Sequence, residues 1–513
     1  MLLIHPPVVR PCEPPPGLAV LAGSLKAHDA AFEILEANVE GIHHFLKTVG
    51  SMPVPAGRDG NRPDTWTRRA HHHHSNNLSL LTSPSGYTNI NRYGRAVGDI
   101  QRLLEKCQCE AGAHLGLANF TDDRLSPVRS SDLAICAENP QNNPFYPYFQ
   151  SRLTQLIENK QPTSVGISLN YLSQVLCTFA MIGFLKIRYP SMHIILGGGL
   201  ATSWMRQPGW RNLFSGLIDT WFAGPAEAQL IRHLGFEWCG GRQPPLYDRF
   251  LPDQADYFSP GFILPYSASS GCYWGNCSFC PERAEENPYR PLPAEDVVHE
   301  LRELTDRTQP VLIHLIDNAL SPVHLRALAK NPPGAPWYGF VRITDALTDR
   351  GFCIELRQSG CVMLQLGLES GDQDVLDALN KGVDLVMAAK ALRAIKAAGI
   401  ASYIYLLFGT PPETLAAAQK TLRFVVQHSD QIRFLNLAIF NLPAFGPDTD
   451  SLDTEEFYDG DLVLYRNFRH PCGWNRQNVR RFLDREFRRH QAVTPILRRD
   501  PPVFTSNHAP FFV

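Results

Sequence analysis

Three cysteines within nine residues form the part of this sequence best suited to chemistry. Cys272, Cys277 and Cys280 lie in the segment Ser270-Gly271-Cys272-Tyr273-Trp274-Gly275-Asn276-Cys277-Ser278-Phe279-Cys280-Pro281. Three thiolates at this spacing can converge on one soft metal centre. Zinc is the alternative, but a structural zinc site is closed by four ligands. The next candidates for a fourth ligand, His299 and Cys353, fall in predicted regular elements. The pattern therefore favours a [4Fe–4S] cluster with one iron left open.

The remaining composition is that of a globular protein. The other nine of the 12 cysteines are mostly scattered singly, which does not indicate a disulfide framework in a chain of 513 residues without an export signal. A formal charge of −2, with no long run of either sign, argues against nucleic acid or an anionic membrane as the main partner. No window approaches the roughly 18 apolar residues of a membrane span. We therefore expect a soluble cytoplasmic enzyme with no transmembrane segment.

The cysteines must be positioned by one of two predicted α/β regions. In the first region, apolar runs at 1–4, 32–35, 165–169, 193–196 and 218–222 alternate with helical patterns. This predicts a doubly wound, flavodoxin-like domain over 1–240. Residues 41–160 are rich in Pro, Asn, Ser and Arg and are expected to form an inserted subdomain with a helix at 96–107. His71–His74 could bind a metal, but no carboxylate or cysteine lies nearby, so a solvated loop is expected.

The second region, 245–445, contains the cysteines. Strands are predicted at 263–267, 311–316, 338–343, 362–368, 403–408 and 434–440. Helices lie between them, one ending at Gly399 and another beginning with a capping box at 410–413. Six such units predict a partial (β/α)6 TIM-type barrel. The tail, 446–513, interleaves arginines with aromatic residues and predicts a small helical region whose aromatics pack on the barrel; gripping an anionic substrate is the alternative.

Three charged residues follow predicted barrel strands. Asp317 and Glu369 fall at carboxyl ends of strands, where such barrels build their sites, so a functional role is favoured over helix capping or ion pairing. Arg342 is a further strand-end candidate and could bind a carboxylate. Glu413 lies at the third position of the capping box, so a structural role is the alternative to a functional one.

With these motifs, the chain resembles radical S-adenosylmethionine (SAM) proteins that carry a cobalamin-binding domain, over 1–40 and 161–445. The common cysteine pattern of the family is C-x3-C-x2-C, whereas this chain has one extra residue in the first gap. The resemblance implies that Cys272, Cys277 and Cys280 ligate three irons of a [4Fe–4S] cluster and that SAM chelates the fourth. Further SAM contacts are implied for Phe279, Asp317, Asn318, Glu369, Ser370 and Gly409, and Arg342 could bind a carboxylate of SAM or of the substrate.

The resemblance also implies cobalamin in the first domain. The matching stretches place small residues after strands, and those implied to contact the cofactor are Ser168, Gly197, Gly198, Gly199 and Gly224. The cobalt-binding pattern Asp-x-His-x-x-Gly does not occur in this sequence, so a corrinoid held without a protein lower ligand is expected, with a degenerate domain as the alternative. Asn170, Tyr171 and Gln174 could face the corrin or begin a helix.

The activity implied is reductive cleavage of SAM, hydrogen abstraction from an unactivated carbon and methyl transfer from methylcobalamin. An electron donor such as ferredoxin or flavodoxin is implied, and a small-molecule or lipid-like substrate is expected. One alternative is radical chemistry without methyl transfer, such as oxidative cyclisation or rearrangement. The other is a non-catalytic iron–sulfur or corrinoid-binding protein.

Overall fold

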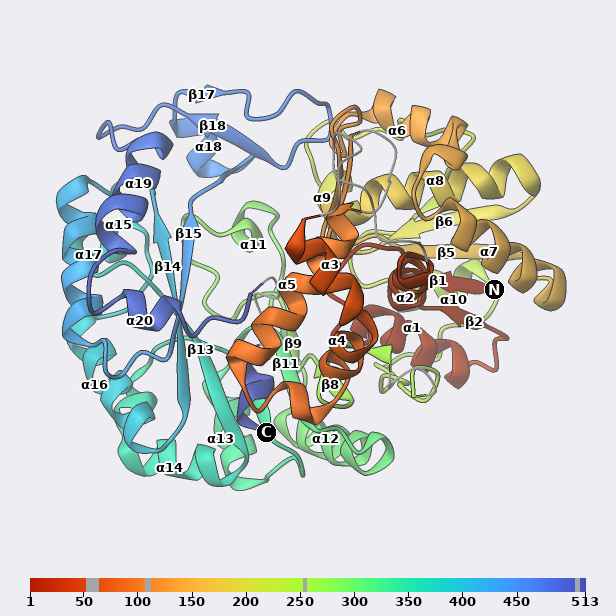
Figure 1. The fold of residues 1–513 in the computed structure, drawn as a ribbon. Helices are drawn as coiled ribbons and strands as arrows, with labels where there is room; N and C mark the ends of the chain where they lie inside the picture. The colour runs from red at the N-terminus through yellow and green to blue at the C-terminus, as the bar shows by residue number, and fades with distance from the viewer. Residues whose placement is uncertain (52–63, 107–111, 252–255, 503–507) are drawn as a thin grey trace. The chain divides into compact units, whose positions relative to one another are not determined.

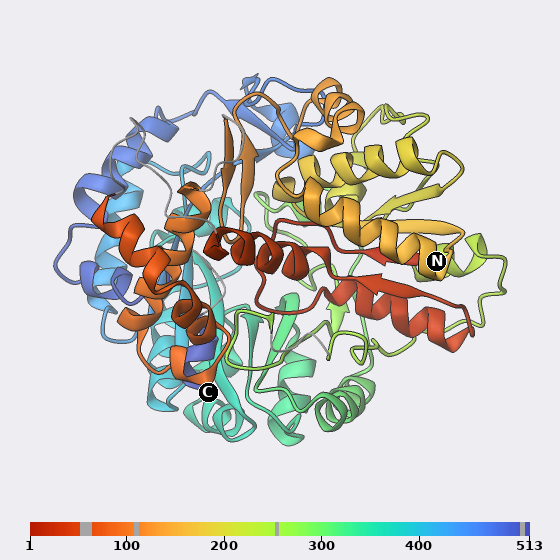
Figure 2. The ribbon, with the colours of Figure 1, turned by 45° about the vertical axis from the view of Figure 1, so that its right-hand side comes forward.

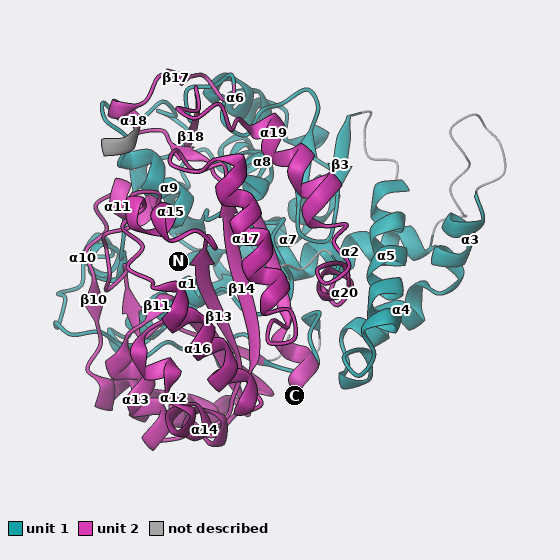
Figure 3. Cartoon of the chain, turned by 90° about the vertical axis from the view of Figure 1, so that its left-hand side faces the viewer, with its two compact units in different colours: residues 1–262, 459–463, 502–505 teal, residues 263–458, 464–501, 506–513 magenta. Residues whose placement is uncertain are grey.

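The computed structural model describes residues 1–51, 64–106, 112–251, 256–502 and 508–513. These residues divide into two compact units, which are considered separately (Figure 3). Unit 1 comprises 1–262, 459–463 and 502, and unit 2 comprises 263–458, 464–501 and 508–513. None of the described helices has the length and apolar character needed to cross a membrane.

Unit 1 is built on a five-stranded parallel sheet. Its strands are β1 (Leu2–Ile4), β2 (Glu33–Leu35), β5 (Ser164–Ser168), β6 (His193–Gly197) and β7 (Thr220–Trp221). Their order is β2-β1-β5-β6-β7, and every pairing is parallel. The main helices are α1 (Pro16–Ala27), α7 (Tyr146–Lys160), α8 (Leu172–Arg188), α9 (Gly199–Met205) and α10 (Glu227–His233). Helices α1 and α10 lie on one side of the sheet, and α7 and α8 lie on the other (Figure 1, Figure 2). This order is the flavodoxin-like one, so the predicted fold is confirmed.

Between β2 and β5 the described residues form helices and a hairpin. The elements are α2 (Ala37–Ser51), α3 (Thr65–His72), α4 (His74–Leu81), α5 (Ile90–Lys106), β3 (Ala113–Leu115), β4 (Phe120–Asp122) and α6 (Ser130–Glu138). The helix expected at 96–107 is present and begins earlier; Cys107 lies outside the described residues. The expected solvated loop at His71–His74 is wrong. These histidines join α3 to α4, and the buried ring of His74 packs on Gly50, where a Cβ would lie 2.7 Å from it.

Unit 2 is built on a six-stranded parallel sheet. The strands are β8 (Ile263–Tyr266), β11 (Leu312–Leu320), β12 (Trp337–Val341), β13 (Cys361–Glu369), β14 (Ala401–Phe408) and β15 (Phe434–Ile439). They follow one another in chain order, with β8 and β15 at the edges. The intervening helices are α12 (Ala294–Thr308), α13 (Pro322–Lys330), α14 (Arg350–Gln358), α15 (Gln373–Ala378), α16 (Leu385–Ala397) and α17 (Leu415–Gln427). The sheet is thus an open, partial barrel, as predicted.

A hydrophobic cluster fills the amino end of this barrel. It contains Ile263, Leu312, Tyr338, Val362, Met363, Tyr403, Phe434 and, from the C-terminal segment, Ala509. The ring of His508 lies 4.3 Å from that of Tyr403 and closes the same end. Stabilising contacts therefore gather at the amino ends of the strands, and the carboxyl ends remain for a site.

The tail, together with the strand β16 just before it, adds short elements to unit 2. They are β16 (Leu442–Pro443), α18 (Pro447–Ser451), β17 (Thr454–Glu455), β18 (Tyr465–Phe468), α19 (Arg476–Phe482), a π-helical turn (Leu483–Phe487) and α20 (Thr494–Leu497). The buried rings of Phe482 and Phe487 contact Phe408 at the end of β14, at 6.3 and 5.4 Å. Arg480 and Arg485 are exposed. The expected packing of tail aromatics on the barrel is confirmed.

The capping box predicted at 410–413 is wrong. Helix α17 begins at Leu415, and its N-cap is Thr414, whose hydroxyl accepts from the backbone N–H of Ala417 at 3.2 Å. The Glu413 carboxylate instead accepts hydrogen bonds from the backbone N–H of Gly409 and, at 2.9 Å, from Nε1 of Trp474. Glu413 therefore bonds to Trp474 in the tail and does not cap a helix. Its hydrogen bond with Gly409 fixes the turn after β14.

The close contact between α6 and α8 in unit 1 can be tested by adding a methyl group at Gly183. Gly183 in α8 lies so close to the Ala137 carbonyl of α6 that a Cβ would overlap it. We expect Gly183→Ala to destabilise the protein by about 1–3 kcal/mol, as overpacking does. Gly98→Ala in α5, where no atom lies within 4 Å of the added Cβ, should be neutral or stabilise by up to ~1 kcal/mol. Chemical denaturation of both variants measures this, and equal midpoints would contradict the close packing.

Glu413 predicts a pH dependence of stability. Burial raises its pKa from 4.5 to about 7, although the hydrogen bonds from Gly409 and Trp474 oppose the rise. The folded chain therefore keeps a proton that the unfolded chain releases. The contribution of this protonation to the free energy of unfolding is full below pH 4.5 and is lost as the pH rises through 7. Relative to Glu413→Gln, the wild type should lose about 3 kcal/mol of unfolding free energy across this range.

Denaturation at several pH values checks this expectation. Glu355→Gln, at an exposed position on α14, is the matched control and should leave the pH profile of the wild type unchanged. Parallel profiles for the wild type and Glu413→Gln would contradict the raised pKa of Glu413.

Candidate functional site

The cysteine loop follows β8 at the carboxyl edge of the barrel sheet. It begins at β9 (Ser269–Ser270), which pairs with β10 (Arg290–Pro291), and it ends at α11 (Pro281–Ala284). Cys277 is buried, whereas Cys272 and Cys280 are half-buried, and all three are unpaired thiols. The three predicted ligands thus share one loop at the end of the barrel where such folds place their sites.

Asp317 holds the beginning of this loop. Its two carboxylate oxygens accept hydrogen bonds from the Ala268 backbone N–H at 3.0 Å and the Ser269 hydroxyl at 2.5 Å. Burial raises the pKa of Asp317, and these two hydrogen bonds oppose that effect. Asn318, the next residue of β11, is exposed. The sequence placed both residues just after a strand ending at 316, whereas β11 extends to Leu320 and includes them. The observed contacts of Asp317 position the loop.

Backbone carbonyls in the turn after α15 accept hydrogen bonds from the cysteine loop. Nε1 of Trp274 donates to the Asn380 carbonyl at 2.9 Å, and the Ser278 N–H donates to the Leu379 carbonyl at 3.1 Å. Gly382 has a φ of +64°, and a Cβ there would overlap the Trp274 indole. Only glycine therefore satisfies both the turn and the close approach of the ring.

Arg342, directly after β12, connects this turn to the cysteine loop. Its guanidinium donates to the Lys381 carbonyl, and Nη1 lies 3.8 Å from Sγ of Cys277. The same group lies 4.3 Å from the centroid of the Trp274 ring. With only 7% of its surface exposed, Arg342 is a buried cation beside a candidate ligand. The strand-end position was predicted, but these partners were not.

Glu369 at the end of β13 forms an ion pair that the sequence analysis missed. Its carboxylate lies 2.8 Å from Nζ of Lys381, and the two side chains are 12% and 7% exposed. Glu369 adopts a left-handed φ of +67°, a strained conformation typical of functional sites. A Cβ on Gly367 would lie 2.6 Å from the Glu369 carboxylate, so glycine makes room for the pair. The ammonium of Lys381 also lies 5.6 Å from the Phe279 ring.

Three other predicted SAM contacts lie in unit 2. Phe279 packs against Val375, Leu379 and Ala417. Ser370 is buried, and its hydroxyl accepts from the Asp372 N–H at 3.1 Å, so it shapes the turn after β13. Gly409 has a φ of +79° and begins the turn that Glu413 fixes.

The chemistry of the cysteine loop fits a cluster. Burial raises the pKa of Cys277, while the charges of Lys381 and Arg342 oppose the rise. Burial also raises the pKa of Cys280 to about 11. The described side chains form no group of three His, Cys, Asp or Glu residues that could hold a single metal ion. A cluster does not require such a group because each thiolate binds a different iron, and the adjacent cations favour the thiolate forms.

Hydrogen bonds join the strand ends of the unit 1 sheet. The Asn170 side chain accepts from the Gly199 N–H at 2.9 Å and donates to the Ser168 hydroxyl at 3.0 Å. Gln174 is buried and donates to the Pro6 carbonyl at 2.7 Å, linking the loops after β1 and β5. The point where the strand order reverses lies between these strands and is the usual ligand position of this fold. Tyr171 is exposed.

The predicted glycines of this edge permit close approach of backbone. Gly198, after Gly197, has a φ of +107°, and a Cβ there would overlap the Leu169 carbonyl. Gly224 has a φ of +67°, and its N–H donates to the Thr202 hydroxyl at 2.9 Å. The glycines thus allow tight turns at the carboxyl edge of the unit 1 sheet.

A buried His–Glu pair at the same edge was missed from the sequence. Nδ1 of His5, directly after β1, lies 2.7 Å from the carboxylate of Glu36, directly after β2. The residues are 6% and 3% exposed. A histidine immediately after a short apolar strand was the available signal, but its distant glutamate was not identifiable.

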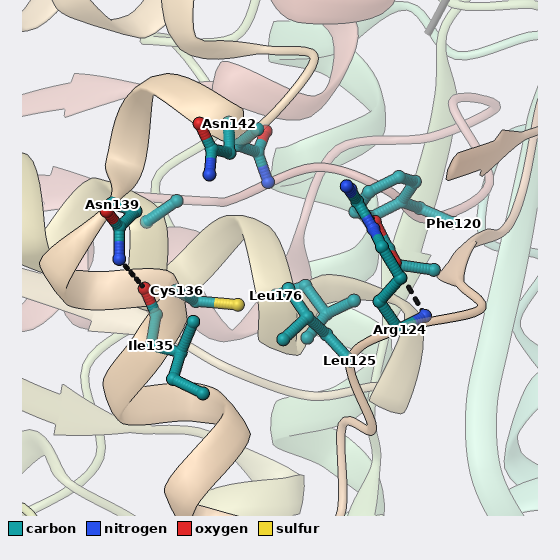
Figure 4. Close-up of a pocket in the computed structure, with 11 residues that line it drawn as sticks. Phe120, Arg124, Leu125, Ile135, Cys136, Asn139, Asn142 and Leu176 are labelled. Carbon is teal, nitrogen blue, oxygen red and sulfur yellow. Dashed lines mark hydrogen bonds and ion pairs between the residues drawn. The ribbon is translucent and has the colours of Figure 1, made fainter. Parts of the chain in front are cut away.

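Unit 1 also contains a cavity of about 220 Å³ between α6, α8 and the segment after β4. In Figure 4 the Asn139 and Asn142 side chains lie at one end and Arg124 at the other, with Leu125 and Leu176 between them. Arg124 pairs with Asp122 at 3.0 Å. Burial raises the pKa of the lining thiol Cys136 to about 12, so it stays neutral. This lining offers a mainly apolar binding surface and no activated thiol.

Comparison with known sequences identifies the central domain. The Radical SAM superfamily matches residues 266–425, from the end of β8 into α17. The anaerobic magnesium-protoporphyrin IX monomethyl ester cyclase of Rubrivivax gelatinosus is 26% identical over 160 residues, or 30% of this chain and 28% of that protein. The chain thus matches little more than a quarter of that relative.

Solved structures resemble the chain over a larger share. OxsB, a cobalamin-dependent SAM radical enzyme with aqua-cobalamin bound, has a TM-score of 0.52 at 13% identity and covers 84% of this chain and 52% of its own. TsrM from Kitasatospora setae, a radical SAM methyltransferase with cobalamin and a [4Fe–4S] cluster bound, has a TM-score of 0.51 at 16% identity, covering 93% and 84%. Residues 266–425 therefore belong to the Radical SAM superfamily, and the chain has the α/β fold that OxsB and TsrM share.

Proposed function

We propose that this protein is an enzyme that binds a [4Fe–4S] cluster through Cys272, Cys277 and Cys280 and uses it to cleave SAM reductively. The observation that carries the proposal is the cysteine loop itself, three unpaired thiols at the carboxyl edge of a radical SAM domain. Two buried cations, Arg342 and Lys381, lie beside it. A non-catalytic iron–sulfur protein would not need this loop to open onto a barrel of six strands.

The chain's own residues would place SAM next to the cluster. Glu369 is the main candidate for the SAM ribose or amino group because it ends β13 at the carboxyl edge of the barrel sheet and has a strained backbone conformation typical of functional sites. Phe279 and Gly409 would contribute an aromatic ring and a glycine turn on the adenine side of SAM. Asp317 and Ser370 act through the loops they hold, and Asn318 offers an exposed amide.

When bound, the cluster and SAM supply one-electron chemistry, and cobalamin supplies methyl-transfer chemistry. The protein's part would be to bind and orient each group and to limit the access of water to it. An external electron donor such as ferredoxin or flavodoxin would serve the cluster, and the substrate would be a small or lipid-like molecule.

Cobalamin would bind at the carboxyl edge of the unit 1 sheet. The flavodoxin-like strand order and the fixed turns at Asn170 and Gly198 support this assignment. OxsB and TsrM, which share the fold, are described with cobalamin bound. We therefore propose methylation of an unactivated carbon as the reaction.

Radical chemistry without methyl transfer is the second candidate. The observation that favours it is the sequence match to a protein described as an anaerobic cyclase. Both candidates use the same cysteine loop, and they differ in whether a corrinoid takes part.

Replacing Cys277 by alanine tests the cluster assignment. We expect loss of most iron and acid-labile sulfide after anaerobic reconstitution, and no formation of 5′-deoxyadenosine from SAM, because one of three ligands is removed. Cys472→Ala, at an exposed cysteine of the same unit, is the matched control and should match the wild type. Cleavage of SAM by Cys277→Ala at the wild-type rate would refute the assignment.

Binding of hydroxocobalamin tests the corrinoid assignment. The protein, incubated with hydroxocobalamin and passed through a desalting column, should retain the corrinoid spectrum at close to one equivalent because the edge of unit 1 is preformed. Complete loss of corrinoid from a protein that still cleaves SAM would favour the second candidate.

A further inference from the structure

We infer that Lys381, together with Arg342, sets the reduction potential of the cluster held at Cys277, and that Glu369 opposes them. This inference rests on the proposed function, and it assigns to Lys381 a role that neither its sequence position nor the family match indicates. Lys381 would act on the cluster through its charge.

The first support is the placement of charge around Cys277. Nη1 of Arg342 lies 3.8 Å from the sulfur. The ammonium of Lys381 lies 5.6 Å from the centroid of the Phe279 ring, a residue that stands between Cys277 and Cys280 in the loop, and 2.8 Å from the Glu369 carboxylate. Two cations and one carboxylate therefore lie around this part of the cysteine loop.

The second support is that the three charged side chains are secluded from water. Lys381 and Glu369 expose 7% and 12% of their side chains, and Arg342 exposes 7% of its surface. Charges in such surroundings are screened little and interact more strongly than surface charges. Their effect on a neighbouring redox centre is accordingly large.

The third support is that the ammonium of Lys381 and the backbone of its turn make different contacts. The turn holds the cysteine loop through the carbonyls of Leu379 and Asn380, and its Lys381 carbonyl accepts a hydrogen bond from Arg342. The described contacts of the ammonium are the Glu369 carboxylate and the face of the Phe279 ring. A side-chain substitution at Lys381 can therefore remove the charge and leave the backbone contacts in place.

The direction of the effect follows from electrostatics. Reduction transfers one electron from the reductant to the cluster, so the reduced form is the more negative one. Nearby cations stabilise that form and raise the potential, and a nearby carboxylate lowers it. Removing the charge of Lys381 should make the cluster harder to reduce, and removing that of Glu369 should make it easier.

The test is a potentiometric titration of the anaerobically reconstituted protein without SAM, with dithionite as the reductant, redox mediators, and electron paramagnetic resonance as the readout. We expect Lys381→Met to lower the equilibrium constant of reduction at least tenfold, a shift of about 59 mV to more negative potential. Glu369→Gln should shift the potential in the positive direction. Lys381→Arg should stay close to the wild type.

Lys396→Met is the matched control. Lys396 pairs with Asp430 at 2.7 Å, and both side chains are at least half exposed, so its loss should leave the potential unchanged. If Lys381→Met does not fold, the opposite shift expected of Glu369→Gln still tests the inference. Potentials that do not move, or that move in the same direction in Lys381→Met and Glu369→Gln, would overturn it. Absence of iron and labile sulfide from the wild type would overturn the proposed function as well.

Discussion

The guanidinium of Arg342 is the contact on which the arrangement of the candidate site depends. It comes from the end of β12, donates to the Lys381 carbonyl and approaches the Cys277 sulfur while it stacks on Trp274. A planar cation with several donors can make these contacts at the same time, whereas a lysine could not. The cysteine loop, the neighbouring strand and the turn after α15 are thereby joined before any ligand binds, which preorganises the loop.

Much of this arrangement could be predicted from sequence because parallel strands bring their carboxyl ends to one edge. The six apolar runs of the barrel were long enough to identify, and the cysteine triad, Arg342 and Glu369 each follow one of them. The same rule located the small residues after β5 and β6 in unit 1. Spacing along the chain was sufficient wherever a strand end determined the position of a residue.

Features that depend on distant partners could not be predicted. Lys381 lies 12 residues after Glu369, in a turn whose sequence shows no ionic motif. The capping box at 410–413 failed because Glu413 is used by Trp474, 61 residues away. His74 was expected in a loop, but it is buried against Gly50 on another helix. In each case a tertiary contact overrode a local pattern.

A cluster held by the three cysteines would leave one iron open to SAM. Electron paramagnetic resonance of the reduced, reconstituted protein with and without SAM tests this directly. We expect the spectrum to change when SAM is added, because SAM would bind the open iron. A reduced cluster whose spectrum is identical in the presence of saturating SAM would contradict it.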